Sequence, residues 1–330
     1  MTVPTDLEIR AAPCPECYLC GTKGELLYSG LRDRLFGAPG RWDLKRCPVF
    51  DCGLIWLDPM PIEEDISKAY QAYYTHQNGY PRRRENVLRN LFRSPLSAAY
   101  ELLLHAIAVR SERKRLAILG LNNMPPGKLL EVGCGNGRLL ALLGNLGWQV
   151  EGQELDPEAA AFARTTYHVK VHVGPLNSVP VVEGSFDAIV MNHVIEHVHE
   201  PISVLSACHR LLKPEGKLLV VTPNTAGEGY RRFGSSWVHL DPPRHLHLFS
   251  CQTLRRIAQK AGLKRYETWT TTVSSRFTAQ ASLNIRHPER KVPAIRIGRY
   301  IAAVIFHLWA ASLCLWRKDS GEECIIRVTK

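Results

Sequence analysis

The chain has 330 residues, of which 45% are hydrophobic and 22% charged, and its net charge is +11. These values are typical of a soluble globular protein with room for one large and one smaller domain. The basic excess is either a solvated surface or a site for an acidic substrate, an anionic membrane surface or nucleic acid.

Two cysteine pairs mark the first predicted element, residues 1–61. The stretches CPECYLCG (14–21) and CPVFDCG (47–53) have the spacing of a zinc ribbon, in which two knuckles supply four thiolates to one ion. No apolar run precedes them, so we expect no secretory signal and a reducing compartment, where clustered thiols favour metal over disulfides. A ribbon that has lost its metal is the alternative. Gly21 and Gly53 suit the tight turns. The predicted ligands are Cys17, Cys20, Cys47 and Cys52, and Cys14 could replace Cys20.

Residues 62–124 are predicted to form a helical connector that could serve as a lid. The stretch EEDISKAYQAYYTH is amphipathic, and residues 94–121 carry apolar side chains at the three-to-four spacing of a helix face. The stretch NMPPGK then breaks the chain before the next element.

Residues 125–330 alternate between expected strands and helices, which is typical of a parallel, doubly wound sheet. Asp156 is placed to cap one of the helices and Ser250 another. Two closing strands are expected at 264–273 and 323–330. The five earlier strands are expected at 128–134, 148–155, 170–175, 186–192 and 216–224.

The turn after the first of these strands is rich in glycine, at positions 133, 135 and 137. Glycines there let a ligand approach the backbone at a helix N-terminus. The spacing departs from the dinucleotide fingerprint G-x-G-x-x-G, because Arg138 occupies the sixth position. Glu131 suits a ligand with a cationic group better than a pyrophosphate, which a carboxylate would repel. Glu154, at the end of the second strand, is placed to hydrogen-bond the hydroxyls of a ribose.

Four stretches in this order resemble the class I methyltransferases that use S-adenosylmethionine: LEVGCGNG, VEGQELDPEA, GSFDAIVMNHVIEHVHEP and LLKPEGKLLVVTPN, within residues 128–224. The resemblance implies a Rossmann-like α/β sheet of seven strands, the last one antiparallel. It implies that Glu131 lies near the amine of the cofactor, that Glu154 holds the ribose, and that Leu176 and Asn177 flank the adenine. The residues that it places against the cofactor are Glu131, Gly133, Gly135, Gly137, Glu154 and Leu176.

The flanking stretches also resemble such enzymes. Cysteine pairs followed by GLIWLDPMP and YQAYYT look like a zinc-binding module found on some bacterial methyltransferases, and SSWVHLDPPRHLHLFSCQTL is similar to a stretch after their fifth strand. Many of these relatives modify sugars, glycolipids or polyketide-like products.

Residues 193–197, HVIEH, match a zinc-peptidase pattern in which two imidazoles share one helix face. The motif follows a strand of an open sheet, and ligands bind beyond the carboxyl ends of such strands. We therefore expect Asn192 and His193 to face the cofactor cleft. The sequence shows no downstream helix that would supply a third metal ligand, which counts against the peptidase. Glu196 and His197 are expected to orient loops or each other, and the alternative is a direct catalytic role for His197.

His245 and His247 alternate, so they are expected to point to opposite sides of an extended segment. His245 is the leading candidate for a catalytic base, because a histidine can take a proton from a hydroxyl near neutral pH; a structural hydrogen bond is the alternative. Arg244 beside it is a candidate for binding an acidic acceptor.

Residues 300–316, YIAAVIFHLWAASLCLW, are apolar on all sides and lie between basic residues. They are shorter than a membrane-spanning helix, so the plain interpretation is a buried helix. An interfacial helix that brings the enzyme to a lipid-linked substrate is the alternative.

The sequence therefore predicts a cytoplasmic methyltransferase, membrane-associated if residues 300–316 are interfacial, with S-adenosylmethionine as cofactor and a structural zinc ion. The acceptor would be a small molecule, a sugar or a lipid-linked molecule, methylated at oxygen, or else at carbon or nitrogen. One rival is a zinc-ribbon protein that binds or modifies nucleic acid, although the cysteine pairs lack interleaved basic and aromatic residues. The other rival is the zinc peptidase.

Overall fold

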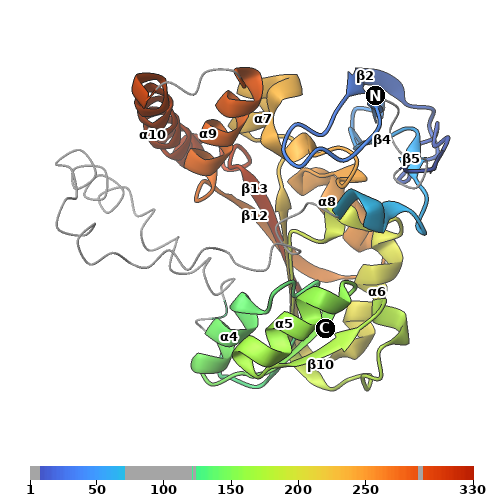
Figure 1. Ribbon diagram of the computed structural model, residues 1–330. Coiled ribbons are helices and arrows are strands. Elements are labelled where there is room, and N and C mark those ends of the chain that lie inside the picture. The colour runs from blue at the N-terminus through green and yellow to red at the C-terminus, as the bar shows by residue number, and fades with distance from the viewer. Residues whose placement is uncertain (1–7, 71–120, 122–123, 289–292) are drawn as a thin grey trace, which may run out of the picture.

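The computed structural model describes residues 8–70, 121, 124–288 and 293–330 (Figure 1). Most of the predicted helical connector, residues 62–124, lies outside the described residues. In its described part, Ile66–Tyr70 forms a single 3-10 helix, η2.

Seven strands form the central sheet, in the order β12-β13-β10-β9-β6-β7-β8. The last strand, β13, runs antiparallel to both of its neighbours, whereas the pairings among β6 to β10 are parallel. This confirms the predicted doubly wound, Rossmann-like sheet. The strands are β6 (Lys128–Val132), β7 (Gln149–Glu154), β8 (Lys170–Val173), β9 (Phe186–Asn192), β10 (Leu212–Pro223), β12 (Arg265–Thr271) and β13 (Glu323–Thr329).

Helices cover both faces of this sheet, because alternate strand residues point to opposite sides. Leu219 of β10 belongs to one apolar core with α4 and α5, whereas the adjacent Leu218 belongs to the other core with α6 and α8. Two predicted caps are present: Asp156 accepts a hydrogen bond from the Glu158 N–H (2.9 Å), and Ser250 forms a capping box. The helices are α4 (Arg138–Asn145), α5 (Pro157–Tyr167), α6 (Pro201–Leu211) and α8 (Cys251–Lys260).

The N-terminal region builds a small sheet that is completed from far along the chain. Its strand order is β11-β4-β3-β2, and β11 pairs antiparallel with β4 through His247 and Trp56. Residues 1–61 therefore share a sheet with the segment that carries the candidate histidines. The strands are β1 (Ala11–Ala12), β2 (Glu25–Leu31), β3 (Trp42–Arg46), β4 (Ile55–Leu57), β5 (Met60–Pro61), which pairs with β1, and β11 (His247–Leu248).

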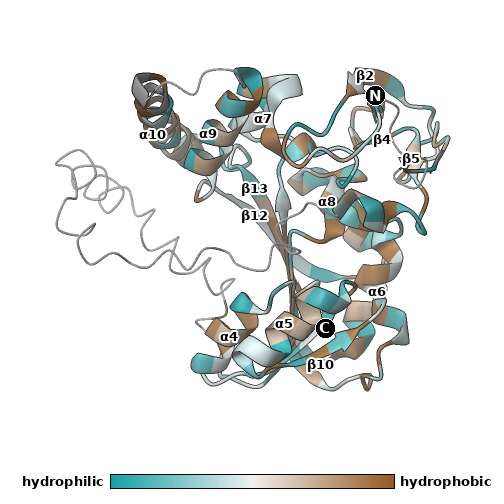
Figure 2. Cartoon of the chain, viewed as in Figure 1, coloured by the Kyte–Doolittle hydropathy of each residue, from teal (hydrophilic) through white to brown (hydrophobic). Residues whose placement is uncertain are grey.

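A pair of helices, α9 (Ser275–Arg286) and α10 (Pro293–Trp316), packs together at one end of the molecule (Figure 1). The expectation of a buried helix at 300–316 is wrong: α10 has 24 residues, and 28% of the window Ile297–Trp316 is buried. By length and composition alone, that window could cross a membrane, with a mean hydropathy of 1.5. Hydrophobic residues recur along α10 in Figure 2. Shorter helices α7 (Glu228–Phe233), η6 (Gly234–Ser236) and η7 (Val238–Leu240) lie before β11.

Candidate active site

The glycine-rich turn follows β6 and leads into α4. Gly133, Gly135 and Gly137 have φ angles of 66°, 50° and 77°, in the left-handed region that glycine adopts without cost. A Cβ atom on Gly133 would lie 2.5 Å from Cγ2 of Val194. The turn therefore packs closely against Val194, and the half-buried Gly133 and Gly135 lie at the edge of the sheet where parallel strands end, which is where ligands bind in this type of fold.

Glu131 lies beneath this turn with 4% of its surface exposed. Its Oε2 atom is buried and has no hydrogen-bond partner in the part of the chain that the structure describes. Burial, together with repulsion from Glu154, raises the pKa of Glu131 well above its usual value. A buried acceptor without a partner is costly, so the site fits a cationic donor such as the ammonium group of S-adenosylmethionine.

Glu154 closes the turn from the end of β7. Its Oε2 accepts the Gly135 N–H at 2.7 Å, and its Oε1 accepts the N–H groups of Leu155 (2.8 Å) and Asp156 (3.0 Å). These three donors fix the carboxylate at the mouth of the turn, where Oε2 keeps a lone pair for a further donor. The fixed carboxylate suits the hydroxyls of the predicted ribose.

Gln153 was missed by the sequence reasoning. Its side chain is buried, accepts the Gly133 N–H at 3.2 Å and donates to the Gly174 carbonyl at 2.7 Å. The amide therefore joins the turns after β6 and β8. A polar residue directly before Glu154 could have indicated this role. Side chains alternate between the two faces of a strand, so one of the two neighbours had to be buried.

The remaining cofactor candidates lie at the ends of β8 and β9. Leu176 is buried in the short 3-10 helix η4 (Leu176–Ser178), which contacts α6. Asn177 and Asn192 are exposed. The roles of Leu176, Asn177 and Asn192 toward the cofactor stay predictions.

His193 is held between two buried carboxylates. Its Nδ1 lies 3.2 Å from Oε1 of Glu196, and its Nε2 lies 3.2 Å from Oε1 of Glu323, the first residue of β13. Burial opposes the charged ring, but the two carboxylates outweigh it and raise the pKa of His193 to about 10. The cofactor edge of the sheet thus carries an imidazolium ion near neutral pH.

The zinc-peptidase interpretation of HVIEH is wrong for this fold. The segment Ile195–His197 is a single 3-10 turn, η5, and His193 precedes it with a left-handed φ of 54°. The two imidazoles therefore do not share the face of an α-helix, and His193 binds carboxylates with both of its nitrogens.

The two candidate catalytic histidines lie together. The rings of His197 and His245 contact edge to face, with centroids 4.6 Å apart. Nδ1 of His245 lies 2.7 Å from the His239 carbonyl, and burial followed by repulsion from His197 lowers the pKa of His245 well below its usual value. His247 is buried on another side, with Nδ1 3.2 Å from the Val198 carbonyl. Glu196, His197 and His245 also offer ligand atoms within 4.8 Å of one another, which is a spacing that a metal ion could use.

Arg244 does not bind the acceptor, contrary to expectation. Its side chain is fully buried and forms ion pairs with Asp33, at 2.8 Å, and with Asp241. It also donates to the Ala69 carbonyl at 2.9 Å. Sequence could not reveal this role, because the partner Asp33 belongs to the N-terminal region. Arg244 ties that region to the histidine segment.

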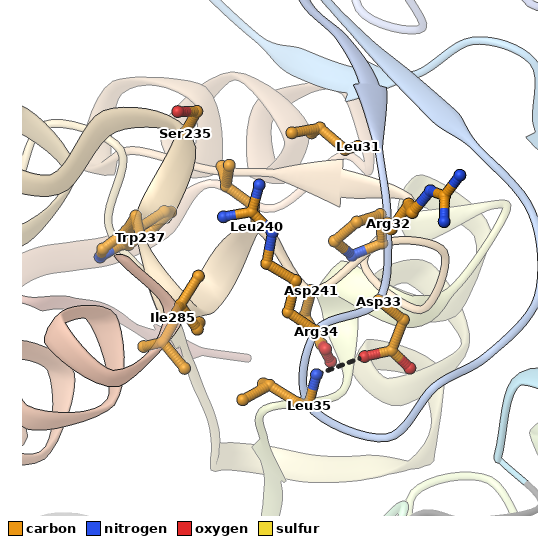
Figure 3. A pocket seen from close by; sticks show the side chains of 12 residues that line it. Leu31, Arg32, Asp33, Arg34, Leu35, Ser235, Trp237, Leu240, Asp241 and Ile285 are labelled. Atoms are coloured by element: carbon orange, nitrogen blue, oxygen red, sulfur yellow. Dashed lines mark hydrogen bonds between the residues drawn. The ribbon is translucent and has the colours of Figure 1, made fainter. Parts of the chain in front are cut away.

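A pocket opens between the loop at 31–35 and the segment at 235–242 (Figure 3). Asp33 stiffens the loop, since its Oδ1 accepts the Leu35 N–H at 2.9 Å. The ring of Trp237 contacts that of His239, which in turn stacks on His193 with centroids 6.2 Å apart. A row of rings thus connects the pocket to the cofactor edge. The lining includes Leu31, Arg32, Arg34, Leu35, Trp237 and Leu240.

The four predicted cysteine ligands form one cluster. Sγ of Cys17 lies 3.6 Å from that of Cys52, and Sγ of Cys20 lies 3.4 Å from that of Cys47. These separations are near the roughly 3.8 Å edge of a tetrahedron with zinc–sulfur bonds of about 2.3 Å. The four thiols lie within 4.8 Å of one another, and Cys14 is outside the group. The knuckle glycines at 21 and 53 are left-handed, as predicted.

Comparison with known proteins is consistent with this geometry. Residues 104–268, half of the chain, match a family model described as a methyltransferase domain. A ubiquinone biosynthesis O-methyltransferase of Xanthomonas oryzae pv. oryzae is 38% identical over 103 residues, covering 29% of this chain and 43% of the relative. A probable S-adenosylmethionine-dependent methyltransferase of Mycolicibacterium smegmatis is 36% identical over 97 residues, covering 29% of this chain and 38% of the relative. The chain thus spans less than half the length of these relatives.

Among solved structures, a methyltransferase of Thermotoga maritima, described as a possible histamine N-methyltransferase, aligns with a TM-score of 0.44 and 20% identity, covering 69% of this chain and 98% of that chain. Phosphoethanolamine N-methyltransferase 2 of Haemonchus contortus aligns with a TM-score of 0.47 and 17% identity, covering 90% of this chain and 71% of that chain.

Proposed function

This chain belongs to the methyltransferase-domain family of class I, and on that premise we propose that it methylates an oxygen of a small molecule, a sugar or a glycolipid with S-adenosylmethionine. The observation that carries the proposal is the buried Glu131 carboxylate, whose Oε2 has no partner among the described residues and lies beneath the glycine-rich turn. Carboxylate and turn together suit a ligand with an ammonium group and a flat, extended body.

The bound cofactor would supply a methyl group on a sulfonium, which is already a good leaving group. Glu131 would hold the ammonium end and Glu154 the ribose hydroxyls, so that two fixed carboxylates orient the ligand along the ends of β6 and β7. Most of the rate enhancement would then come from alignment of the acceptor oxygen with the methyl carbon.

The proton of an acceptor hydroxyl needs a base, and His245 is the best candidate. Its Nδ1 faces the His239 carbonyl, which can only accept a hydrogen bond, so Nδ1 carries the proton and Nε2 keeps its lone pair. Because burial lowers the pKa of His245, the ring is neutral at neutral pH and able to accept a proton. His197, in ring contact with it, would orient it.

The pocket beside Trp237 has a cavity volume of about 20 Å³, so an acceptor bound here would have to displace its walls (Figure 3). Apolar side chains line it, while Arg32 and Arg34 on its loop are exposed. The carboxylate of Asp33 is already engaged by Arg244 and by the loop N–H groups. The pocket therefore presents uncompensated positive charge, which suits an acceptor with an apolar body and an anionic group.

The four-cysteine cluster would hold a structural zinc ion. Four thiolates leave no open position for a substrate or water, so the ion would stabilise the N-terminal region and take no part in methyl transfer. This region carries the pocket loop and the partner of Arg244, so its integrity bears on the site.

Isothermal titration calorimetry with S-adenosylmethionine tests the cofactor assignment. We expect binding by the full chain and a loss of about tenfold to a hundredfold in affinity for Glu131→Gln, which keeps the shape but loses the charge. Glu25→Gln, at an exposed carboxylate of β2, is the control. An absence of binding, or an unchanged affinity in Glu131→Gln, would falsify the assignment. Incubation of the enzyme with methyl-labelled cofactor and separated aqueous and lipid extracts then locates the acceptor.

A further inference from the structure

One face of α10 is apolar and exposed from end to end. Its opposite face is buried against the protein through Ala303, Phe306 and Ala310. The exposed hydrophobic residues recur every four positions from Ile297 to Trp309 and return at Leu315 and Trp316, so they form a stripe along the helix. They are Ile297 (61% exposed), Ile301, Ile305 (61%), Trp309 (47%), Leu315 and Trp316 (87%).

The charged residues within α9 and α10 are all basic, and the acidic Asp319 follows the short basic extension of α10. The sequences of α9 and α10 contain no aspartate or glutamate. Arg317 and Lys318 follow the helix directly and are exposed. The basic residues of the two helices and of this short extension are Arg276, Arg286, Arg296, Arg299, Arg317 and Lys318. An apolar stripe within a purely cationic helix pair is complementary to a surface of anionic lipids.

The two exposed tryptophans of α10 also favour a lipid surface. Trp309 and Trp316 are exposed on the stripe, and tryptophan favours the boundary between lipid headgroups and acyl chains because its ring is apolar and its N–H is polar. A soluble partner of matching shape would need acidic residues around an apolar groove, whereas an anionic bilayer supplies both features over any area.

We propose that the α9–α10 pair docks on an anionic membrane surface, with α10 lying in the interface and its apolar stripe facing the acyl chains. A spanning orientation conflicts with the packing of α10. Arg299 donates to Oδ1 of Asn284 (2.8 Å) and to the His287 carbonyl (2.7 Å), which ties α10 to the end of α9. A spanning helix would have to give up these contacts and the buried face.

Docking would bring the bilayer close to the active site. α9 carries Thr278, whose Oγ1 lies 3.2 Å from Nε2 of His239, and Ser282, whose Oγ accepts the Val238 N–H at 3.0 Å. His239 stacks on His193 at the cofactor edge. These contacts link the site to the proposed membrane surface through α9. The docking itself does not depend on methyl transfer.

Cosedimentation of the full chain with vesicles tests the proposal. We expect binding to vesicles of phosphatidylcholine with phosphatidylglycerol, much weaker binding to phosphatidylcholine alone, and a loss of binding in high salt. Ile305→Ser with Trp309→Ser should weaken binding about tenfold or more. Arg317→Glu with Lys318→Glu should also weaken it, by about fivefold for each charge removed.

Val182→Ser is the matched control, because Val182 is an exposed hydrophobic residue (73%) outside the helix pair. Circular dichroism checks that each variant stays folded. Equal binding to neutral and anionic vesicles, or full binding by the Ile305/Trp309 variant, would overturn the proposal. So would a dimer that the same variant abolishes in sedimentation velocity without lipid, since a second copy would then cover the stripe. Resistance to extraction by alkaline carbonate would show a spanning helix instead.

Discussion

The imidazoles of His197 and His245 meet edge to face, 4.6 Å between centroids, and each directs its Nδ1 at a backbone carbonyl. His197 faces the Arg244 carbonyl at 3.0 Å, and His245 faces that of His239 at 2.7 Å. Since carbonyls only accept hydrogen bonds, His245 carries its proton on Nδ1 and keeps the lone pair of its Nε2. Nδ1 of His197 also lies 2.9 Å from the Tyr70 hydroxyl, so a second polar group helps to hold that ring against His245.

Replacing His245 should slow catalysis without weakening cofactor binding. His245→Asn keeps a donor for the His239 carbonyl but lacks the Nε2 lone pair, so kcat should fall by about a hundredfold or more. His247→Asn, two residues further on in β11, should retain most of the activity. Steady-state kinetics and calorimetry separate the two effects, and an unchanged kcat in His245→Asn would exclude it as the base.

Cofactor binding should release a proton. The pKa of Glu131 is raised by burial and by Glu154, so the free protein keeps the Glu131 proton to a higher pH than an ordinary glutamate does, and an incoming ammonium group favours the ionised form. The affinity for S-adenosylmethionine should therefore rise with pH up to the pKa of Glu131 in the free protein, and calorimetry in buffers of different ionisation enthalpy should register the proton. Glu131→Gln should show neither effect. A pH-independent affinity in the unmodified protein would contradict this.

Zinc content should follow the clustered cysteines and ignore Cys14. Cys47→Ser should lose the metal and destabilise the N-terminal region, whereas Cys14→Ser, at a cysteine outside the cluster, should keep it. Metal analysis by mass spectrometry and thermal unfolding measure both outcomes. Full retention of zinc in Cys47→Ser would point to Glu196, His197 and His245 as the ligands.

The protein should lose stability toward alkaline pH because of Glu322. Burial, with Glu323 and Glu228 nearby, raises the pKa of Glu322 to about 8 from 4.5. A carboxyl with a raised pKa contributes stability that is fully present below pH 4.5 and is lost as the pH rises through about 8. Glu322→Gln should therefore be more stable than the unmodified protein at pH values above 8, by about 2–4 kcal/mol, and nearly equal at low pH.

Thermal unfolding across the pH range checks this, with Glu323→Gln as the neighbouring control. Glu323 pairs with His193, so its replacement should destabilise the protein, by about 3 kcal/mol. If the stability of Glu322→Gln and of the unmodified protein followed parallel pH profiles, the pKa of Glu322 would be the same in the folded and unfolded states, which would contradict this prediction.

Arg244 should matter for stability rather than for acceptor affinity. Arg244→Met leaves the buried carboxylates of Asp33 and Asp241 without their partner, at a cost of about 3–5 kcal/mol in the free energy of unfolding. Arg34→Met, at the exposed arginine that follows Asp33, should change the free energy of unfolding by less than about 0.5 kcal/mol. Denaturant titration measures both, and equal stabilities would contradict the buried role.

Local patterns predicted the α/β half of the fold well. The helix caps at Asp156 and Ser250, the left-handed glycines and the seven-stranded order all follow from interactions between residues near in sequence or from a recognised motif order. Glu131 was placed correctly at the end of a strand, but that its Oε2 is buried without a partner follows from tertiary packing.

Contacts between distant segments were beyond sequence reasoning. The pairing of Arg244 with Asp33 and of β11 with β4 joins residues about two hundred positions apart, and no local pattern encodes such partners. The exposure of α10 was also missed, because a helix that is apolar on all sides has the same composition whether protein or lipid covers it.

Because β11 pairs with β4, we expect the cysteine region and the histidine segment to be kept or lost together in evolution. A homologue without residues 1–61 would expose the edge of β11 at His247 and Leu248. It would also lack Asp33, so Asp241 would be the one remaining carboxylate partner of Arg244 among the described residues. Homologues that have gained or lost the cysteines should therefore also carry substitutions around residue 245, about two hundred positions away.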